Sequence, residues 1–209
     1  MINLGRYNPQ SELLIGEVMT IEGYHIIVSL YPDKYRDVEL ASPLYISTED
    51  CGVFALAISN ITRSKYGKEF TLFRRGLGRD VEKIYPDLKT HYNYIVESLN
   101  IYYIDINGRV LRRRGCNPSP HDEVYLMHRD DFKNILSLNG FNSDVIRILA
   151  EDSPDPVLMR EFLYKIKDAL DEYDLNELIS RLLDSLYTAG YRKLDLFIRD
   201  FREVFLDET

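Results

Sequence analysis

The chain has 209 residues, of which 45 % are hydrophobic and 29 % charged, and its formal net charge is −8. A chain of this length can bury a core without disulfides or metals. Its longest apolar run, residues 53–58, is far shorter than a membrane-spanning helix of ~20 residues, and residues 1–10 contain no signal-peptide core. These features exclude a membrane-spanning helix and a small disulfide scaffold, and we expect a cytoplasmic globular protein.

The negative charge is concentrated at the C-terminal end. Residues 151–209 hold 15 acidic and 8 basic side chains, a net charge of −7, whereas residues 1–150 carry −1. Proteins that grip duplex DNA normally present a basic face, because phosphate neutralisation supplies most of the affinity. DNA contact is therefore expected only through local basic patches in the first 150 residues. The single glutamine is weakly typical of thermophilic proteins.

Short strands separated by turns are predicted for the N-terminal part. Residues 14–19 and 24–30 are rich in β-branched side chains, are separated by a Glu-Gly turn, and predict a hairpin. Residues 36–40 alternate polar and apolar, which predicts a strand that Pro43 limits to an edge or an end. Residues 53–61 are apolar on both faces, as in a barrel strand that is also covered from outside. Strands at this spacing favour a small barrel or sandwich.

The next segment is irregular up to residue 91 and is followed by the strongest hairpin signal of the chain. Residues 64–78 include a basic loop, and residues 80–84 predict a short helix that ends before Pro86. Residues 94–106 alternate, and Asn107-Gly108 then supplies the two positive φ angles of a type I′ turn. We expect a long hairpin here. Prolines follow it, and residues 124–127 predict a last strand that closes the barrel.

The hydrophobic period changes from 2 to 3.6 in the C-terminal part. A short helix is predicted at 130–138, and the helical period resumes from Ser143, beginning with Val145, Ile146 and Leu149. Three amphipathic helices then follow, which predict a helical bundle. We therefore expect an α+β protein, in which residues 1–140 form a small antiparallel β-barrel and residues 141–209 an acidic helical domain. The stripe of the first of the three helices consists of Leu158, Phe162, Ile166 and Leu170.

Taken together, five short motifs resemble the HAS barrel over roughly residues 13–138. They are Ile15-Gly16-Glu17-Val18, Tyr85-Pro86-Asp87-Leu88, the turn Asp105-x-Asn107-Gly108-Arg109, Pro118-x-Pro120, and Val124-Tyr125 before a short helix. The HAS barrel is the N-terminal domain shared by HerA-type DNA-translocating ATPases and by subunits of rotary ATP synthases. In HerA this barrel lies on one face of a hexameric ring and helps to receive the NurA nuclease. The resemblance thus implies an oligomer whose partners are HerA/NurA-type DNA-processing proteins.

The motor of that family is missing from the sequence. A nucleotide-binding loop needs Gly-Lys followed by Ser or Thr, but the only Gly-Lys pair, Gly67-Lys68, precedes Glu69, which repels phosphate. The ATPase activity of the family therefore cannot be transferred to this chain, and we expect no cofactor.

Three other groups of residues are weak candidates for a nucleotide-binding, metal-binding or catalytic site. Gly76-Leu77-Gly78 in the basic loop lacks the third glycine of a dinucleotide-binding motif. His121 and His128 flank a predicted strand, where a separation of seven places them on opposite faces, so we interpret them as surface histidines. Asp87, Asp131 and Lys133 loosely match the Pro-Asp and Asp-x-Lys signature of magnesium-dependent nucleases, although the second pair falls on a helix.

Candidate contact residues come from the basic patches and from the last helix. Arg112 and Arg114 share one face of a strand and suit phosphate or carboxylate recognition. The alternative is that they are solvated and balance Asp122 and Glu123. The candidate anion or partner contacts are Arg74, Arg75, Arg112 and Arg114, and the candidate interface, in a last helix over residues 191–205, is Phe197, Phe201 and Phe205.

The two cysteines, Cys51 and Cys116, form no Cys-x-x-Cys pair that would indicate zinc or redox chemistry. We interpret them as two buried or half-buried thiols, with a single disulfide as the alternative. Overall the sequence predicts a non-catalytic, oligomeric adaptor protein related to the barrel of HerA-type DNA repair machinery. The alternatives are a metal-dependent nuclease using Asp87, Asp131 and Lys133, or the N-terminal part of a HerA-like ATPase.

Overall fold

The computed structural model describes residues 11–64, 92–105, 110–112, 116–137 and 155–170, together with Val145, Ile148, Leu149, Asn176, Ser180, Arg199 and Val204. Within these residues the elements are η1 (Ser11–Leu13), β1 (Leu14–Glu22), β2 (His25–Leu30), β3 (Pro43–Ser47), β4 (Cys51–Ser64), β5 (Tyr92–Asp105), β6 (Val110–Arg112), β7 (Glu123–Leu126), α2 (Arg129–Ser137) and α4 (Pro156–Ala169).

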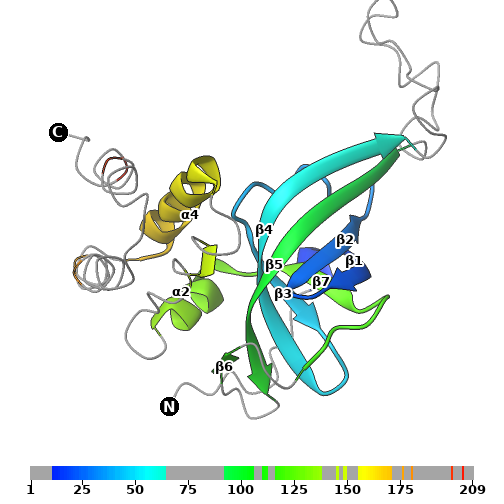
Figure 1. Ribbon diagram of the computed structural model, residues 1–209, viewed down its shortest axis with the longest axis horizontal. Helices are drawn as coiled ribbons and strands as arrows, with labels where there is room; N and C mark the ends of the chain where they lie inside the picture. Colours follow the sequence, from blue (N-terminus) through cyan, green and yellow to red (C-terminus); the bar gives the residue numbers. More distant parts are fainter. Residues whose placement is uncertain are drawn as a thin grey trace, which may run out of the picture.

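The strands form an antiparallel sheet that closes on itself. The order is β2-β1-β7-β3-β4-β5-β6, and β2 also pairs with β5, so that six strands form a closed ring. Strand β6 is not part of this ring and pairs with residues 102–104 of β5, beyond the residues that pair with β2. The predicted small barrel is therefore confirmed, and β7 is the strand that joins β1 to β3, as expected for the closing segment. Figure 1 shows this barrel with helices α2 and α4 on one side of it.

The predicted strand at residues 36–40 is wrong. This segment is a series of turns, and β3 begins only at Pro43, where a missing N–H is tolerated. The alternation arises because Val38 packs into the barrel interior whereas Leu40 packs against the cluster outside it. The Asn60 side chain donates to the Val38 carbonyl at 2.9 Å, which satisfies this group without a strand partner.

The hairpin predicted after residue 94 is confirmed by the antiparallel pairing of β5 with β6. β5 pairs with only three residues of β6, from Tyr102–Arg112 to Ile104–Val110, while it pairs with β4 along nearly its whole length. The Asn107-Gly108 turn lies outside the described residues.

The barrel interior is filled by the protein's own side chains. Ser98 of β5 is a buried polar residue, and its hydroxyl donates to the Ile26 carbonyl of β2 at 3.0 Å. At one end Tyr35 from the turns after β2 stacks on Tyr94, with ring centroids 4.1 Å apart. The interior cluster consists of Ile15, Val18, Ile26, Val28, Leu30, Val38, Leu44, Ile46, Val53, Ala55, Ala57, Tyr94, Val96, Tyr103 and Val124.

A second cluster lies between the barrel and the helices. Strand β4 contributes to both clusters, because Val53 and Ala55 point inward and Phe54 and Leu56 point outward, as its two apolar faces predicted. Four aromatic rings run from helix to strand: Phe162 of α4, Phe132 of α2, Phe54 of β4 and Tyr102 of β5, with successive centroids 6.3, 6.1 and 6.4 Å apart. This outer cluster fixes both helices on the wall formed by β7, β3, β4 and β5.

Helix α4 confirms the first predicted C-terminal helix. Asp155 caps it by accepting a bond from the Val157 amide at 2.9 Å, and Pro156 occupies the first turn, where its missing N–H costs nothing. The predicted stripe is buried, with Leu158, Phe162, Ile166 and Leu170 at most 6 % exposed.

The predicted bundle is only partly visible. Of the two later helices, predicted from Asp174 and over residues 191–205, the structure describes only Asn176, Ser180, Arg199 and Val204, each in helical conformation, so the bundle is not confirmed and α2 and α4 are the helices with defined bounds. Val145, Ile148, Leu149 and Val204 belong to the same outer cluster as the barrel strands, and Lys167 donates to the Val204 carbonyl at 2.8 Å. The domain boundary at residue 140 stays a prediction, but residues from both sides of it share one hydrophobic cluster.

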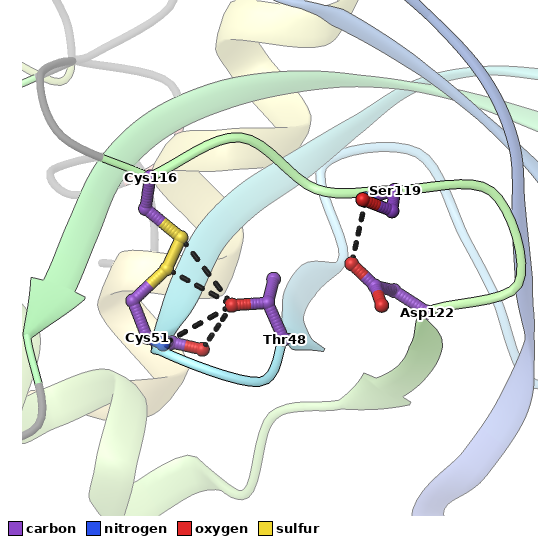
Figure 2. Close-up of a disulfide and its surroundings, with 5 residues drawn as sticks. All are labelled: Thr48, Cys51, Cys116, Ser119 and Asp122. Atoms are coloured by element: carbon purple, nitrogen blue, oxygen red, sulfur yellow. Dashed lines mark hydrogen bonds between the residues drawn. A yellow bond between two sulfur atoms is a disulfide. The ribbon is translucent and has the colours of Figure 1, made fainter.

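The interpretation of the cysteines as thiols is wrong, because Cys51 and Cys116 form a disulfide with a Cα–Cα distance of 6.3 Å. The bond joins the start of β4 to the connector between β6 and β7 (Figure 2). The sequence could not decide this, since the two residues are 65 positions apart and only the barrel brings them together.

Candidate partner-binding surface

Most of the residues predicted to make contacts lie outside the described part of the chain. This holds for Arg74, Arg75, Arg114, Phe197, Phe201 and Phe205, as well as for Asp87 and the Gly76–Gly78 loop. Arg112 lies in β6, opposite Tyr102 of β5. The assignment of these residues to contacts stays a prediction.

The two described members of the nuclease alternative do not converge. Asp131 and Lys133 lie two positions apart in α2, on either side of Phe132, which is 2 % exposed. Residues at i and i+2 of a helix do not face each other, so this carboxylate and this ammonium point in different directions. The position of this pair relative to Asp87 is not tested, because Asp87 lies outside the described residues, so the nuclease alternative stays a prediction.

The two histidines are surface residues, as predicted. His121 lies in the turn before β7, and its side chain is 88 % exposed. The His128 side chain is 54 % exposed and lies 3.7 Å from Asp130. Within the described ranges, no group of three His, Cys, Asp or Glu side chains is placed to hold a metal ion.

The barrel wall formed by β1 and β2 lies opposite the helices (Figure 1). Neither strand contributes a fully buried residue to the outer cluster under α2 and α4, and only Leu14 at the start of β1 packs against that cluster. Residues 14–30 contain no lysine or arginine, and their charged side chains are Glu17 and Glu22. We call the outer face of these strands, with Glu97 of the neighbouring β5 and Glu123 of β7, the open wall.

Two large apolar side chains of this region are exposed to solvent. Met19 is 52 % exposed and lies where the β1–β2 register shifts between Val18 and Thr20. Tyr24 is 43 % exposed in the turn after Gly23, whose φ is 65°. The Asn100 amide donates to the Tyr24 carbonyl at 2.8 Å, which fixes the turn against β5. Met19 thus lies at an irregularity of β1 and Tyr24 in a hydrogen-bonded turn, and both side chains are accessible from solvent.

Two carboxylates are paired across the strands at one side of the open wall. Glu17 lies opposite Glu123, and like charges in this position repel. Each carboxylate accepts a tyrosine hydroxyl, Glu17 from Tyr31 at 2.9 Å and Glu123 from Tyr125. His121 also contacts Glu17 at 3.1 Å, and the bonds from His121 and then Tyr31 lower the pKa of Glu17. These bonds therefore favour the charged form of the Glu17 carboxylate.

A third carboxylate lies further along the same wall. Glu97 of β5 is 2.9 Å from the Nδ1 atom of His25 in β2, with both side chains about one third exposed. This pair joins the two strands across the position where the barrel closes.

Tyr125 should make the stability of the protein depend on pH in the alkaline range. Burial and then the hydrogen bond to Glu123 raise the pKa of Tyr125 to about 12, against about 10 in an unfolded chain. Its contribution to stability should be complete below pH 10 and be lost as the pH rises from 10 to 12, since only the unfolded chain ionises there. Urea unfolding of Tyr125→Phe should show a slope of stability against pH that is shallower than wild type in this window. An unchanged slope would contradict the assignment.

One sign of this surface is present in the sequence, because residues 7–33 contain no lysine or arginine. No model of a known protein family matches the chain, and no curated protein does either. Among the described residues, no helix is both long enough and apolar enough to cross a membrane.

Proposed function

We propose that this chain is a non-catalytic, oligomeric adaptor that binds a protein partner of HerA/NurA type in DNA processing, as its resemblance to the HAS barrel suggests. The observation that supports an adaptor best is the contrast between the two sides of the barrel. The interior and one wall are filled by the protein's own side chains, whereas the open wall holds Met19 and Tyr24 in solvent.

The chemistry of the open wall favours a basic protein partner over DNA. Glu17, Glu22, Glu97 and Glu123 all lie on the strands of the open wall, and their carboxylates would repel a phosphate backbone. A partner that offers lysine or arginine around an apolar patch would match this arrangement. Any DNA contact would have to come from the predicted arginine patches elsewhere in the chain.

The alternatives receive less support. The nuclease hypothesis needs Asp131 and Lys133 on one side of a metal, which their spacing in α2 opposes. The hypothesis that this chain is the N-terminal part of a HerA-like ATPase would need a nucleotide-binding loop that this sequence does not contain. The adaptor proposal therefore remains the one that uses the features of the described surface.

The proposal is tested by binding measurements with matched variants. Met19→Ala and Tyr24→Ala together should weaken binding to a HerA-type ATPase or a NurA-type nuclease by at least about tenfold, because exposed aromatic anchors dominate interface energies. Val157→Ala with Tyr164→Ala is the control, since these α4 side chains are also exposed, at 48 % and 37 %, but lie on the other side. Equal affinity of both double variants, or the absence of binding by wild type, would refute the partner assignment. Light scattering of the purified protein tests the oligomer, and a monomer would contradict that part.

A further inference from the structure

The connector between β6 and β7 crosses one end of the barrel. At residue 116 it is bonded to Cys51 at the start of β4, and at residues 121–122 it is bonded to β1. In the ring of six strands, β4 and β1 lie three places apart and hence on opposite sides. Between these points Cys116 packs on the interior cluster and Pro118 is buried. We call residues 116–122 the strap.

The two ends of the strap are held by different kinds of bond. On the β1 side, the amide of His121 donates to the Val18 carbonyl at 2.8 Å, and the Val18 amide donates to the Asp122 backbone carbonyl at 2.9 Å. The carboxylate of Asp122 accepts a bond from the Ser119 amide at 2.7 Å, which closes a turn (Figure 2). On the β4 side the strap is joined by the disulfide between Cys116 and Cys51. Reduction of the disulfide therefore removes the cross-link between the strap and β4 and leaves the hydrogen bonds to β1 in place.

Thr48 places a hydroxyl beside both sulfur atoms (Figure 2). Its Oγ1 atom lies 3.0 Å from Sγ of Cys51 and 3.4 Å from Sγ of Cys116. The same atom accepts from the Cys51 amide at 3.1 Å and donates to the Cys51 carbonyl at 2.8 Å. The hydroxyl is thus fixed by the backbone of the β3–β4 turn, and its proton needs only a rotation to reach the sulfur of Cys51.

We propose that this disulfide is a site of thiol–disulfide exchange that a small dithiol opens in the folded protein. A thiolate of the dithiol attacks Sγ of Cys116 and forms a mixed disulfide, while the Cys51–Cys116 bond breaks and the electron pair leaves on Cys51. The hydroxyl of Thr48 turns its proton from the Cys51 carbonyl to this thiolate. The second thiol of the reductant then attacks the mixed disulfide and releases Cys116. Two electrons pass to the protein, both cysteines take up protons, and the reductant becomes a disulfide.

The assignment of Cys51 as the leaving sulfur follows from its surroundings. Its sulfur is nearer to the Thr48 hydroxyl than that of Cys116, and hydrogen bonds to a leaving thiolate speed exchange. Three carboxylates oppose a thiolate at this position: Glu49 and Asp50 in the same turn, and Asp105 directly across from Cys51 in β5. Thr48 is therefore the group that offsets this charge, and an anionic thiol should react more slowly than a neutral one.

The test measures exchange in the native protein without denaturant. Wild type is mixed with increasing dithiothreitol, quenched by alkylation and weighed by mass spectrometry, while circular dichroism follows the fold. The expected result is a rate that rises linearly with dithiothreitol, two alkylated cysteines and an unchanged spectrum. A rate independent of dithiothreitol means that the chain must unfold before reduction, and this would overturn the proposal.

The order of attack is tested by trapping and by two substitutions. With the monothiol cysteamine, peptide mapping should find the mixed disulfide on Cys116, and finding it on Cys51 would refute the role given to Thr48. Thr48→Val should slow reduction by about tenfold, the effect of losing one bond to a developing thiolate, whereas Thr48→Ser should stay within threefold of wild type. If Thr48→Val does not fold, the trapping result on wild type still decides the order of attack.

Discussion

Replacing Cys51 and Cys116 together by serine should lower the free energy of unfolding by about 4 kcal/mol. In the chain-entropy account, a bond that closes a loop of 65 residues removes roughly this much freedom from the unfolded chain. The closed loop contains all of β5 and β6 and all of β4 after its first residue, so the bond restricts a large part of the barrel sequence in the unfolded chain. Urea unfolding by circular dichroism measures the effect, which for a chain of this size corresponds to roughly 10 °C in the unfolding midpoint.

The control is wild type reduced by dithiothreitol, which should lose the same stability as the double serine variant. Both forms should still fold, because domains have total stabilities of about 5–15 kcal/mol. A loss below 1 kcal/mol would mean that the unfolded chain is already restricted in this loop, or that the native bond contributes unfavourably. A loss in the serine variant that reduction does not reproduce would point to the lost packing of Cys116 on the barrel interior.

The strands were predictable where the pattern is local. The hairpin of β1 and β2 follows from β-branched segments around Gly23, and the exit strand β7 from the two prolines before it. Similarly, the burial of β4 on both faces followed from its continuous apolar run. In each case a few neighbouring residues determine the outcome, so the sequence contains the whole argument.

The errors arise where distant residues decide. The turns at residues 36–40 imitate a strand because Val38 and Leu40 serve two separate clusters. The disulfide depends on closure of the barrel, which brings the β3–β4 turn to the strap. Likewise the open wall is defined by the position of α2 and α4 on the opposite side, and no periodicity in β1 or β2 reveals which wall the helices cover.

The aromatic row between helix and barrel leads to the last prediction, which concerns whether these parts are one folding unit. Phe162 of α4 is fully buried and meets Phe132 edge-on, at an interplanar angle of 64°. Phe162→Ala should therefore cost about 3–5 kcal/mol, as for other buried phenylalanines. Tyr164→Ala on the same helix is the control and should change stability by at most about 0.5 kcal/mol, because its side chain is 37 % exposed and surface substitutions have small effects.

The way in which the Phe162→Ala protein unfolds then distinguishes a single unit from two. If the outer cluster couples helices and barrel, the strand and helix signals in circular dichroism should be lost together at a lower urea concentration. A chain ending at Gly140 should then be unstable or aggregate, because the outer faces of Phe54 and Leu56 lose the cover that α4 provides. Two separate transitions, with the barrel transition unmoved by Phe162→Ala, would instead support a boundary at residue 140 with an independently stable barrel. The packing of the rings favours the first result, since Phe162 contacts Phe132 of α2 and Phe132 in turn contacts Phe54 of β4, so that the loss of one ring weakens a row that joins both helices to the barrel.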